Sequence, residues 1–144
     1  MNHGIETKDS AILNSQAAGT GTNTSSTLDM QGFEGVKVLV KFGTVVDGAS
    51  LTLKVQQGDQ SDGSDMSELA ADNPVIPVAA SHSEVMFRLD LHRPEKRYVR
   101  AQVIIATQNA EIDSVTAEQY GARKLPVTQL ATVVDKVSIS PAQV

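Results

Sequence analysis

Apolar and polar residues alternate with a period of two through the middle of the chain, and this constrains the fold more than any other feature. Residues 36–42 read VKVLVKF and residues 51–55 read LTLKV. Successive side chains of a strand point to opposite faces. The first segment therefore places its valines and Phe42 on one face, with Leu39 and the lysines on the other, and the second places Leu51, Leu53 and Val55 on one face. Asp47-Gly48 lies between the two segments, and Asp-Gly between apolar runs predicts a β-hairpin.

The same alternation returns in residues 85–91 (VMFRLDL) and 98–105 (YVRAQVII). Residues 107–110 are expected to form a turn, and residues 111–120 a further strand whose weaker alternation indicates a bulge. Residues 125–144 contain two prolines and short apolar pieces, which allow an edge strand. No segment shows a sustained helical period, so the pattern predicts an all-β fold, an antiparallel sandwich or a small barrel. The expected inner layer is Val36, Val38, Val40, Phe42, Leu51, Leu53, Val55, Val85, Phe87, Leu89, Leu91, Val99, Ala101, Val103 and Ile105.

The first 27 residues differ from the rest of the chain. Residues 14–27 consist mainly of Gly, Ser, Thr and Asn, and the only apolar patch before them is at residues 11–13. We therefore expect an N-terminal arm over residues 1–27, partly extended, and a β-sandwich domain over residues 28–144. Such an arm is either flexible or ordered on a neighbouring subunit. The first residues lack the basic start and apolar stretch of a secretory signal.

Composition and charge disfavour several classes of function. The 144 residues carry a formal net charge of −5, whereas proteins that bind nucleic acid nonspecifically usually have a basic balance. No apolar run approaches the roughly 20 residues of a membrane helix. The absence of cysteine excludes disulfides, thiolate zinc sites and a cysteine nucleophile. His3, His82 and His92 have no metal-ligand spacing, and no hydrolase or phosphate-binding motif occurs.

We accordingly expect no catalytic residue, no cofactor and no bound metal. The acidic loop over residues 57–74 is the one place that raises the question of a metal. Its carboxylates are dense enough for calcium, but their spacing does not match the EF-hand, so a solvated loop is favoured. These carboxylates are Asp59, Asp62, Asp65 and Glu68.

Basic residues fall into two groups, one around the charged turn at residues 92–97 and one at residues 123–124. They are either solvated charges at strand ends or a contact surface. Few aromatic residues accompany them, which makes an acidic protein surface the better partner than nucleic acid. The candidate contact residues are Arg93, Lys96, Arg97, Arg100, Arg123 and Lys124.

Two short stretches carry a resemblance to a known family. They are YVRAQV at residues 98–103, after a charged turn with Pro94, and QYGARKLPVT at residues 119–128. Together they resemble head decoration (cement) proteins of tailed bacteriophages, over roughly residues 8–130. The resemblance implies a jelly-roll β-sandwich made in the host cytoplasm that binds the outside of the capsid and stabilises it without catalysis.

The resemblance also implies the partners, namely the major capsid protein and other copies of the chain in a dimer or trimer, with neither membrane nor nucleic acid. Our hypothesis is that Arg97 and Arg100 pair with carboxylates of the major capsid protein. One alternative is a β-sandwich module of the phage neck, tail or fibre. Another is a carbohydrate-binding β-sandwich, for which a chain with no Trp and two Tyr supplies few stacking platforms.

Overall fold

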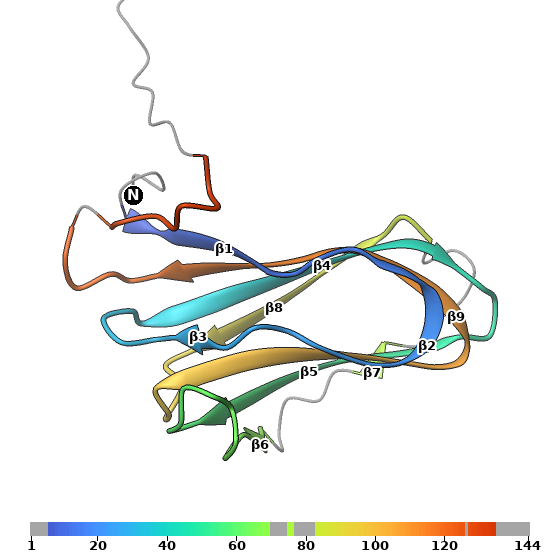
Figure 1. Cartoon of the computed structure of the whole chain (residues 1–144), viewed down its shortest axis with the longest axis horizontal. Coiled ribbons are helices and arrows are strands. Elements are labelled where there is room, and N and C mark those ends of the chain that lie inside the picture. The colour runs from blue at the N-terminus through green and yellow to red at the C-terminus, as the bar shows by residue number, and fades with distance from the viewer. Residues whose placement is uncertain (1–5, 70–74, 77–82, 126, 135–144) are drawn as a thin grey trace, which may run out of the picture.

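The computed structural model describes residues 6–69, 75–76, 83–125 and 127–134, which contain nine strands (Figure 1). The strands are β1 (Lys8–Leu13), β2 (Gln16–Thr24), β3 (Leu28–Asp29), β4 (Gly35–Val45), β5 (Ser50–Gly58), β6 (Ser67–Glu68), β7 (Val75–Ile76), β8 (Met86–His92) and β9 (Tyr98–Tyr120). All of the pairings between them are antiparallel, and they join the strands into one sheet.

Strand β9, with 23 residues, is the spine of the sheet. Its first half pairs with β5, from Gly58 opposite Tyr98 to Ser50 opposite Ala106. Its second half pairs with β4, from Val45 opposite Ala110 to Gly35 opposite Tyr120. Between the halves Thr107 has a φ of 73°, and Figure 1 shows the sheet curling here into a half-barrel whose two layers face each other. The predicted all-β antiparallel sandwich is therefore confirmed.

The hairpin predicted at Asp47-Gly48 is wrong, although the turn is real. Gly48 has a φ of 85° and the Ala49 amide donates to the Val46 carbonyl at 3.1 Å. The strands that this turn joins do not pair with each other, because β4 pairs with β8 and β9 in one layer and β5 pairs with β9 in the other. Both strands have one apolar face, and facing each other across the core buries both faces. The strands form one continuous sheet, whereas a jelly roll packs two sheets against each other.

The core lies between the two layers. Of the fifteen alternating positions predicted to face inward, all those on β4, β5 and β9 are buried. Val85 and the three on β8 (Phe87, Leu89 and Leu91) are half-buried instead, because β8 forms the edge of its layer. Phe42 joins this edge to the core through an edge-to-face contact with Phe87, with ring centroids 5.5 Å apart.

Residues 8–24, expected to belong to an arm, form part of the sandwich. Strand β1 pairs with residues 115–119 of β9, and β2 pairs with residues 102–112. These pairings satisfy the edge of β9 opposite to β4 and β5, which would otherwise leave a long row of backbone groups unpaired. The boundary expected at residue 27 thus does not separate an arm from the sheet, and residues 1–5 lie outside the described residues.

The C-terminal segment contributes no strand in residues 127–134, and residues 135–144 lie outside the described residues. Gln129 nevertheless acts on the outer edge of β1. Its side-chain Oε1 accepts from the Asp9 amide at 3.1 Å, and its Nε2 donates to the Thr7 carbonyl at 2.6 Å. One side-chain amide thereby takes the place of a neighbouring strand for a single residue pair.

Candidate functional site

Three loops meet at the open end of the sandwich, opposite the bend of β9. They are residues 30–34 between β3 and β4, residues 93–97 between β8 and β9, and residues 121–124 after β9. They enclose an open cavity of about 800 Å³. We call this surface the basic end. Its lining consists of Met30, Gln31, Gly32, Phe33, Glu34, Arg93, Pro94, Glu95, Lys96, Arg97, Gly121 and Arg123.

Backbone contacts tie the three loops to one another. The Arg93 amide donates to the Glu34 carbonyl at 2.8 Å, and the Arg123 amide donates to the Gly32 carbonyl at 2.9 Å. Gly121 has a φ of 67°, and a Cβ at this position would lie 2.4 Å from the Cβ of Glu34. The close approach of these loops therefore depends on glycine at residue 121. The fixed backbone of the three loops, and not only their side chains, therefore determines the shape of the cavity.

Arg97 forms the most specific ion pair of the basic end. Its Nε and NH2 donate to the two carboxylate oxygens of Asp29 at 3.0 and 2.8 Å. These hydrogen bonds lower the pKa of Asp29 and raise that of Arg97. The Arg97 guanidinium also lies 5.1 Å from the ring centroid of Tyr98. A two-pronged bond of this kind fixes orientation, although pairs this exposed contribute little to stability.

Two further cations of the loop at 93–97 have partners within the chain. Arg93 donates through Nε and NH2 to Glu34 Oε1 at 3.0 and 2.9 Å, and this lowers the pKa of Glu34. Lys96 Nζ lies 2.6 Å from Asp59 Oδ2, and the resulting hydrogen bond raises the pKa of Lys96. These pairs hold the loop in place and neutralise part of its charge.

Arg123 and Lys124 differ from the other cations, because both are exposed and neither has an ion-pair partner within the described residues. Lys124 and Lys8 line a second cavity of about 300 Å³, which shares residues 31–33 and Arg123 with the first. Six cations and four carboxylates either line the two cavities or form ion pairs with residues that line them. They are Lys8, Arg93, Lys96, Arg97, Arg123 and Lys124 against Asp29, Glu34, Asp59 and Glu95.

The fold therefore brings five of the six predicted contact residues to one end of the molecule. Arg100 is the exception, since its Nε donates to Gln56 Oε1 at 2.7 Å. A Cβ at Gly63 would lie only 2.8 Å from the NH1 atom of Arg100. The guanidinium therefore packs against the loop after β5. Arg100 holds that loop to the sheet and does not line the cavity.

A neighbouring cluster that sequence reasoning missed centres on Tyr120. The Tyr120 hydroxyl donates to Asp90 Oδ1 at 2.6 Å, and its ring stacks on His92 with centroids 6.2 Å apart. Burial, followed by the hydrogen bond to Asp90, raises the pKa of Tyr120 to about 12. Gly35 makes room for this arrangement, because a Cβ there would lie 2.3 Å from the Tyr120 hydroxyl oxygen. The signal available in the sequence was a glycine beginning a strand otherwise rich in valine.

The described part of the acidic loop is folded around its own carboxylates. Asp65 accepts hydrogen bonds from the amides of Asp59 and Gln60 at 2.8 and 3.0 Å, and Asp62 accepts from the Ser64 amide at 2.9 Å. These backbone hydrogen bonds lower the pKa values of Asp62 and Asp65. Within the described residues no group of three or more His, Asp or Glu side chains is arranged to hold a metal ion. None of the helices there has the length and apolar character needed to cross a membrane.

Chemically, the basic end offers fixed guanidinium groups, two cations without an ion-pair partner in the described part of the chain, and an open cavity. Such an arrangement suits recognition of carboxylates on another surface. Phe33 is the one aromatic residue in the lining of the larger cavity, which leaves little platform for stacking a sugar or a base.

No protein-family model matches the chain. No curated protein matches it either. Among solved structures, the crystal structure of the PBSX exported protein XepA is similar, with a TM-score of 0.53 and 16% sequence identity. The match covers 92% of this chain and 43% of that one, so the chain spans less than half the length of that protein. At this sequence identity the similarity shows a shared fold only. The chain therefore has the same fold as part of XepA.

Proposed function

We propose that this chain is a non-enzymatic structural protein of a bacteriophage particle, which binds the exterior of the capsid through its basic end. The observation that carries the proposal is the gathering of Arg93, Lys96, Arg97 and Arg123 around one cavity in a chain of net charge −5. The fold shared with a PBSX exported protein supports a phage-related origin. The partner would be an acidic surface of the major capsid protein.

Arg123 and Lys124 are the better candidates for direct contact than Arg97 and Arg100. The latter two already bond to Asp29 and Gln56 of the same chain, and giving up these bonds would cost part of the energy gained on binding. A single exposed ion pair contributes about 0–1 kcal/mol. Stable attachment would then depend on many copies engaging a repeating lattice, which raises the effective concentration of each contact.

A second candidate function rests on the description of XepA as exported. In that case the chain would act outside the cell as a phage-encoded module and would not be retained in the particle. The same basic end would then face an acidic partner other than the capsid. A neck, tail or fibre module remains the third candidate, distinguished from decoration by a low copy number.

The first test is quantitative mass spectrometry of purified particles and of the culture medium. Hundreds of copies per particle, in simple ratio to the major capsid protein, would support decoration. A dozen or fewer would support the neck or tail. Absence from particles together with presence in the medium would overturn the capsid proposal in favour of the exported module.

The second test measures binding of purified chain to particles that lack it. We expect Arg123→Gln with Lys124→Gln to weaken binding at least tenfold in low salt, with a smaller effect in high salt because such contacts are screened. The matched control is Lys37→Gln with Lys54→Gln, which removes two charges on the outer faces of β4 and β5. Equal loss in both double variants would mean that only net charge matters and would refute the assignment to the basic end.

A further inference from the structure

We propose that strand β8 is a docking edge for a second copy of the same chain. The two β8 strands would pair antiparallel about a two-fold axis at Leu89. This would join the sheets of two sandwiches into one. The proposal concerns the edge of the sheet and goes beyond the role of the basic end.

One backbone edge of strand β8 has no pairing partner among the residues that the structure describes. Within the described residues the strand pairs with β4 alone, in the register Val36 opposite Leu91 through Val40 opposite Phe87. The Phe42 amide donates to the Val85 carbonyl at 3.2 Å, so Phe42 and Val85 are a hydrogen-bonded pair. Hydrogen-bonded pairs alternate along an antiparallel ladder, so residues 85, 87, 89 and 91 bond to β4. The N–H and C=O groups of residues 86, 88, 90 and 92 consequently point away from it.

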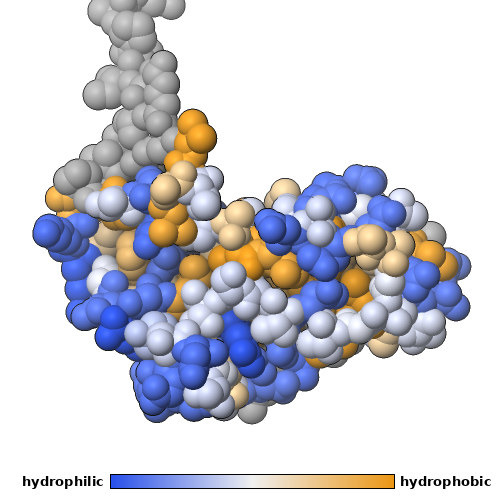
Figure 2. Space-filling model, in the orientation of Figure 1, coloured by the Kyte–Doolittle hydropathy of each residue, from blue (hydrophilic) through white to orange (hydrophobic). Residues whose placement is uncertain are grey.

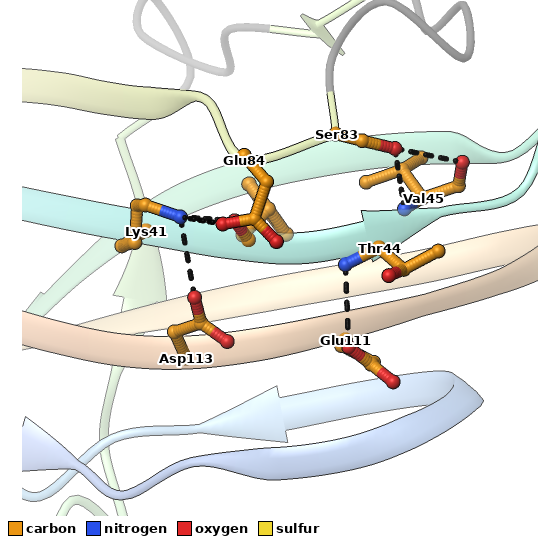
Figure 3. A network of polar contacts seen from close by, with 8 residues as sticks. Lys41, Thr44, Val45, Ser83, Glu84, Glu111 and Asp113 are labelled. Carbon is orange, nitrogen blue, oxygen red and sulfur yellow. Dashed lines mark hydrogen bonds and ion pairs between the residues drawn. The ribbon is translucent and has the colours of Figure 1, made fainter.

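This edge is held in place at its start by a polar network (Figure 3). Lys41 Nζ bonds to Glu84 Oε2 at 2.8 Å and to Asp113 Oδ2 at 3.2 Å. The Ser83 hydroxyl accepts from the Val45 amide at 2.9 Å and donates to its carbonyl at 3.2 Å. These contacts tie the residues that lead into β8 to β4 and β9, so the strand begins from a fixed position.

The other end of the edge is fixed as well, because Asp90 accepts the hydrogen bond from Tyr120 on β9. A strand held at both ends would lose little conformational entropy on pairing, and this favours association. Natural edges are usually protected by being short or by carrying charged side chains, especially lysine, or proline or a bulge. The charged residues of β8, Arg88 and Asp90, are of opposite sign and so can pair across two copies of the strand. The seven residues of β8 pair with β4 without a register shift, and they contain neither lysine nor proline.

The side chains of β8 form two rows. Met86, Arg88, Asp90 and His92 are exposed on the outer face, and the side chain of Arg88 has no partner within the described residues. Phe87, Leu89 and Leu91 are half-buried on the core side. Figure 2 shows apolar surface between the two layers on the face it displays.

Charge selects one register for the pairing. With the two-fold axis at Leu89, Arg88 lies opposite Asp90 of the partner subunit, and Asp90 lies opposite Arg88 of the partner subunit. Moving the axis by one residue places either two arginines or two aspartates opposite each other, which is destabilising. The axis at Leu89 also makes Arg88 and Asp90 a hydrogen-bonded pair, as the outward direction of their backbone groups requires.

The same register continues the apolar row across the interface. Leu89 faces Leu89 of the partner subunit, and Phe87 faces Leu91 of the partner subunit. Because His92 lies at the basic end, the antiparallel arrangement directs the two basic ends away from each other. Such a dimer would present two separate anchoring points to a repeating surface.

A cysteine crosslink tests the register, and the chain contains no other cysteine. Leu89→Cys would face its own copy in a non-hydrogen-bonded pair with Cα atoms about 4.5 Å apart, which is within reach of a disulfide. We expect mild oxidation to give a covalent dimer on a non-reducing gel. The matched control is Leu91→Cys, whose copies would lie several residues apart. Absence of the Leu89→Cys dimer, or equal yield from Leu91→Cys, would overturn the proposal.

Charge exchange provides an independent test by analytical ultracentrifugation of the full chain. Arg88→Glu would place a glutamate opposite each Asp90 and should weaken the dimer about tenfold. Combining Arg88→Asp with Asp90→Arg restores opposite charges and should recover most of the affinity. Far-UV circular dichroism reports whether each variant is folded. A wild-type chain that stays monomeric at high concentration, or a dimer unaffected by Arg88→Glu, would refute the pairing.

Discussion

Replacing Gly35 by alanine should destabilise the protein through a single contact, although alanine is ordinarily the better residue in a strand. A Cβ at residue 35 would lie 2.3 Å from the Tyr120 hydroxyl oxygen, 2.4 Å from its Cζ and 2.8 Å from its Cε2. The ring must therefore leave the surface of β4. Its departure breaks the 2.6 Å hydrogen bond to Asp90 and the stacking on His92.

The expected magnitude follows from these losses. A hydrogen bond to a carboxylate contributes about 1.5–3 kcal/mol, and the exposure of Asp90 places this one at the lower end. Loss of ring packing adds to this, while the glycine-to-alanine change itself returns about 0.5 kcal/mol. We expect a net cost of about 2 kcal/mol, measured by urea unfolding followed by circular dichroism. For a chain of this length the melting temperature should fall by about 4–8 °C.

A double-mutant cycle separates this contact from general strain in β4. In a Tyr120→Ala background the obstacle is gone, so Gly35→Ala should become neutral or stabilising by about 0.5 kcal/mol. The reversal of sign is the diagnostic result. If Gly35→Ala is equally destabilising in both backgrounds, the backbone and not Tyr120 is responsible, and the reasoning is wrong.

Three other changes test separate parts of the fold. Because the pKa of Tyr120 is raised to about 12, its contribution to stability is complete below pH 10 and is lost as the pH rises from 10 to 12; urea unfolding in this range should show a smaller alkaline loss for Tyr120→Phe than for wild type. Thr107→Gly should stabilise the protein by about 0.5–1 kcal/mol, since a β-branched residue with a φ of 73° is strained; a loss of stability in urea would contradict this. Phe42→Leu should cost about 1–1.5 kcal/mol in the same assay, because it removes the edge-to-face contact with Phe87; no loss would mean that the contact contributes little.

The core was predictable from sequence because burial on one face of a strand imposes a period of two. Residues 36–42 and 51–55 show this period clearly, and the apolar residues on the inward-facing side of both segments are buried. The pairing of strands was not predictable in the same way. Asp47-Gly48 specifies a turn, but a turn does not determine whether the flanking strands pair with each other or face each other across a core. That outcome depends on β9, which lies 50 residues further along the chain.

The polar composition of residues 14–24 wrongly indicated an arm for a related reason. A strand at the margin of a sheet can be stabilised by backbone hydrogen bonds to its neighbour without burying apolar side chains, so its sequence carries no alternation. The basic end was predictable in part, because charged turns between strands gather where strand ends meet. The partners Asp29 and Glu34 were not identified, since they come from β3 and the loop after it, more than 50 residues earlier in sequence.

The position of β9 within the chain has a consequence for how the protein folds. Strands β1 to β5 take their main pairing partners from residues 98–120, so most of the sheet lacks these partners until residues 98–120 have left the ribosome. Contacts between residues so far apart in sequence make folding slow. During that interval the valine-rich strands β4 and β5 are exposed and prone to association. The synthesis of β9 thus determines when β1 to β5 can pair and are protected from aggregation.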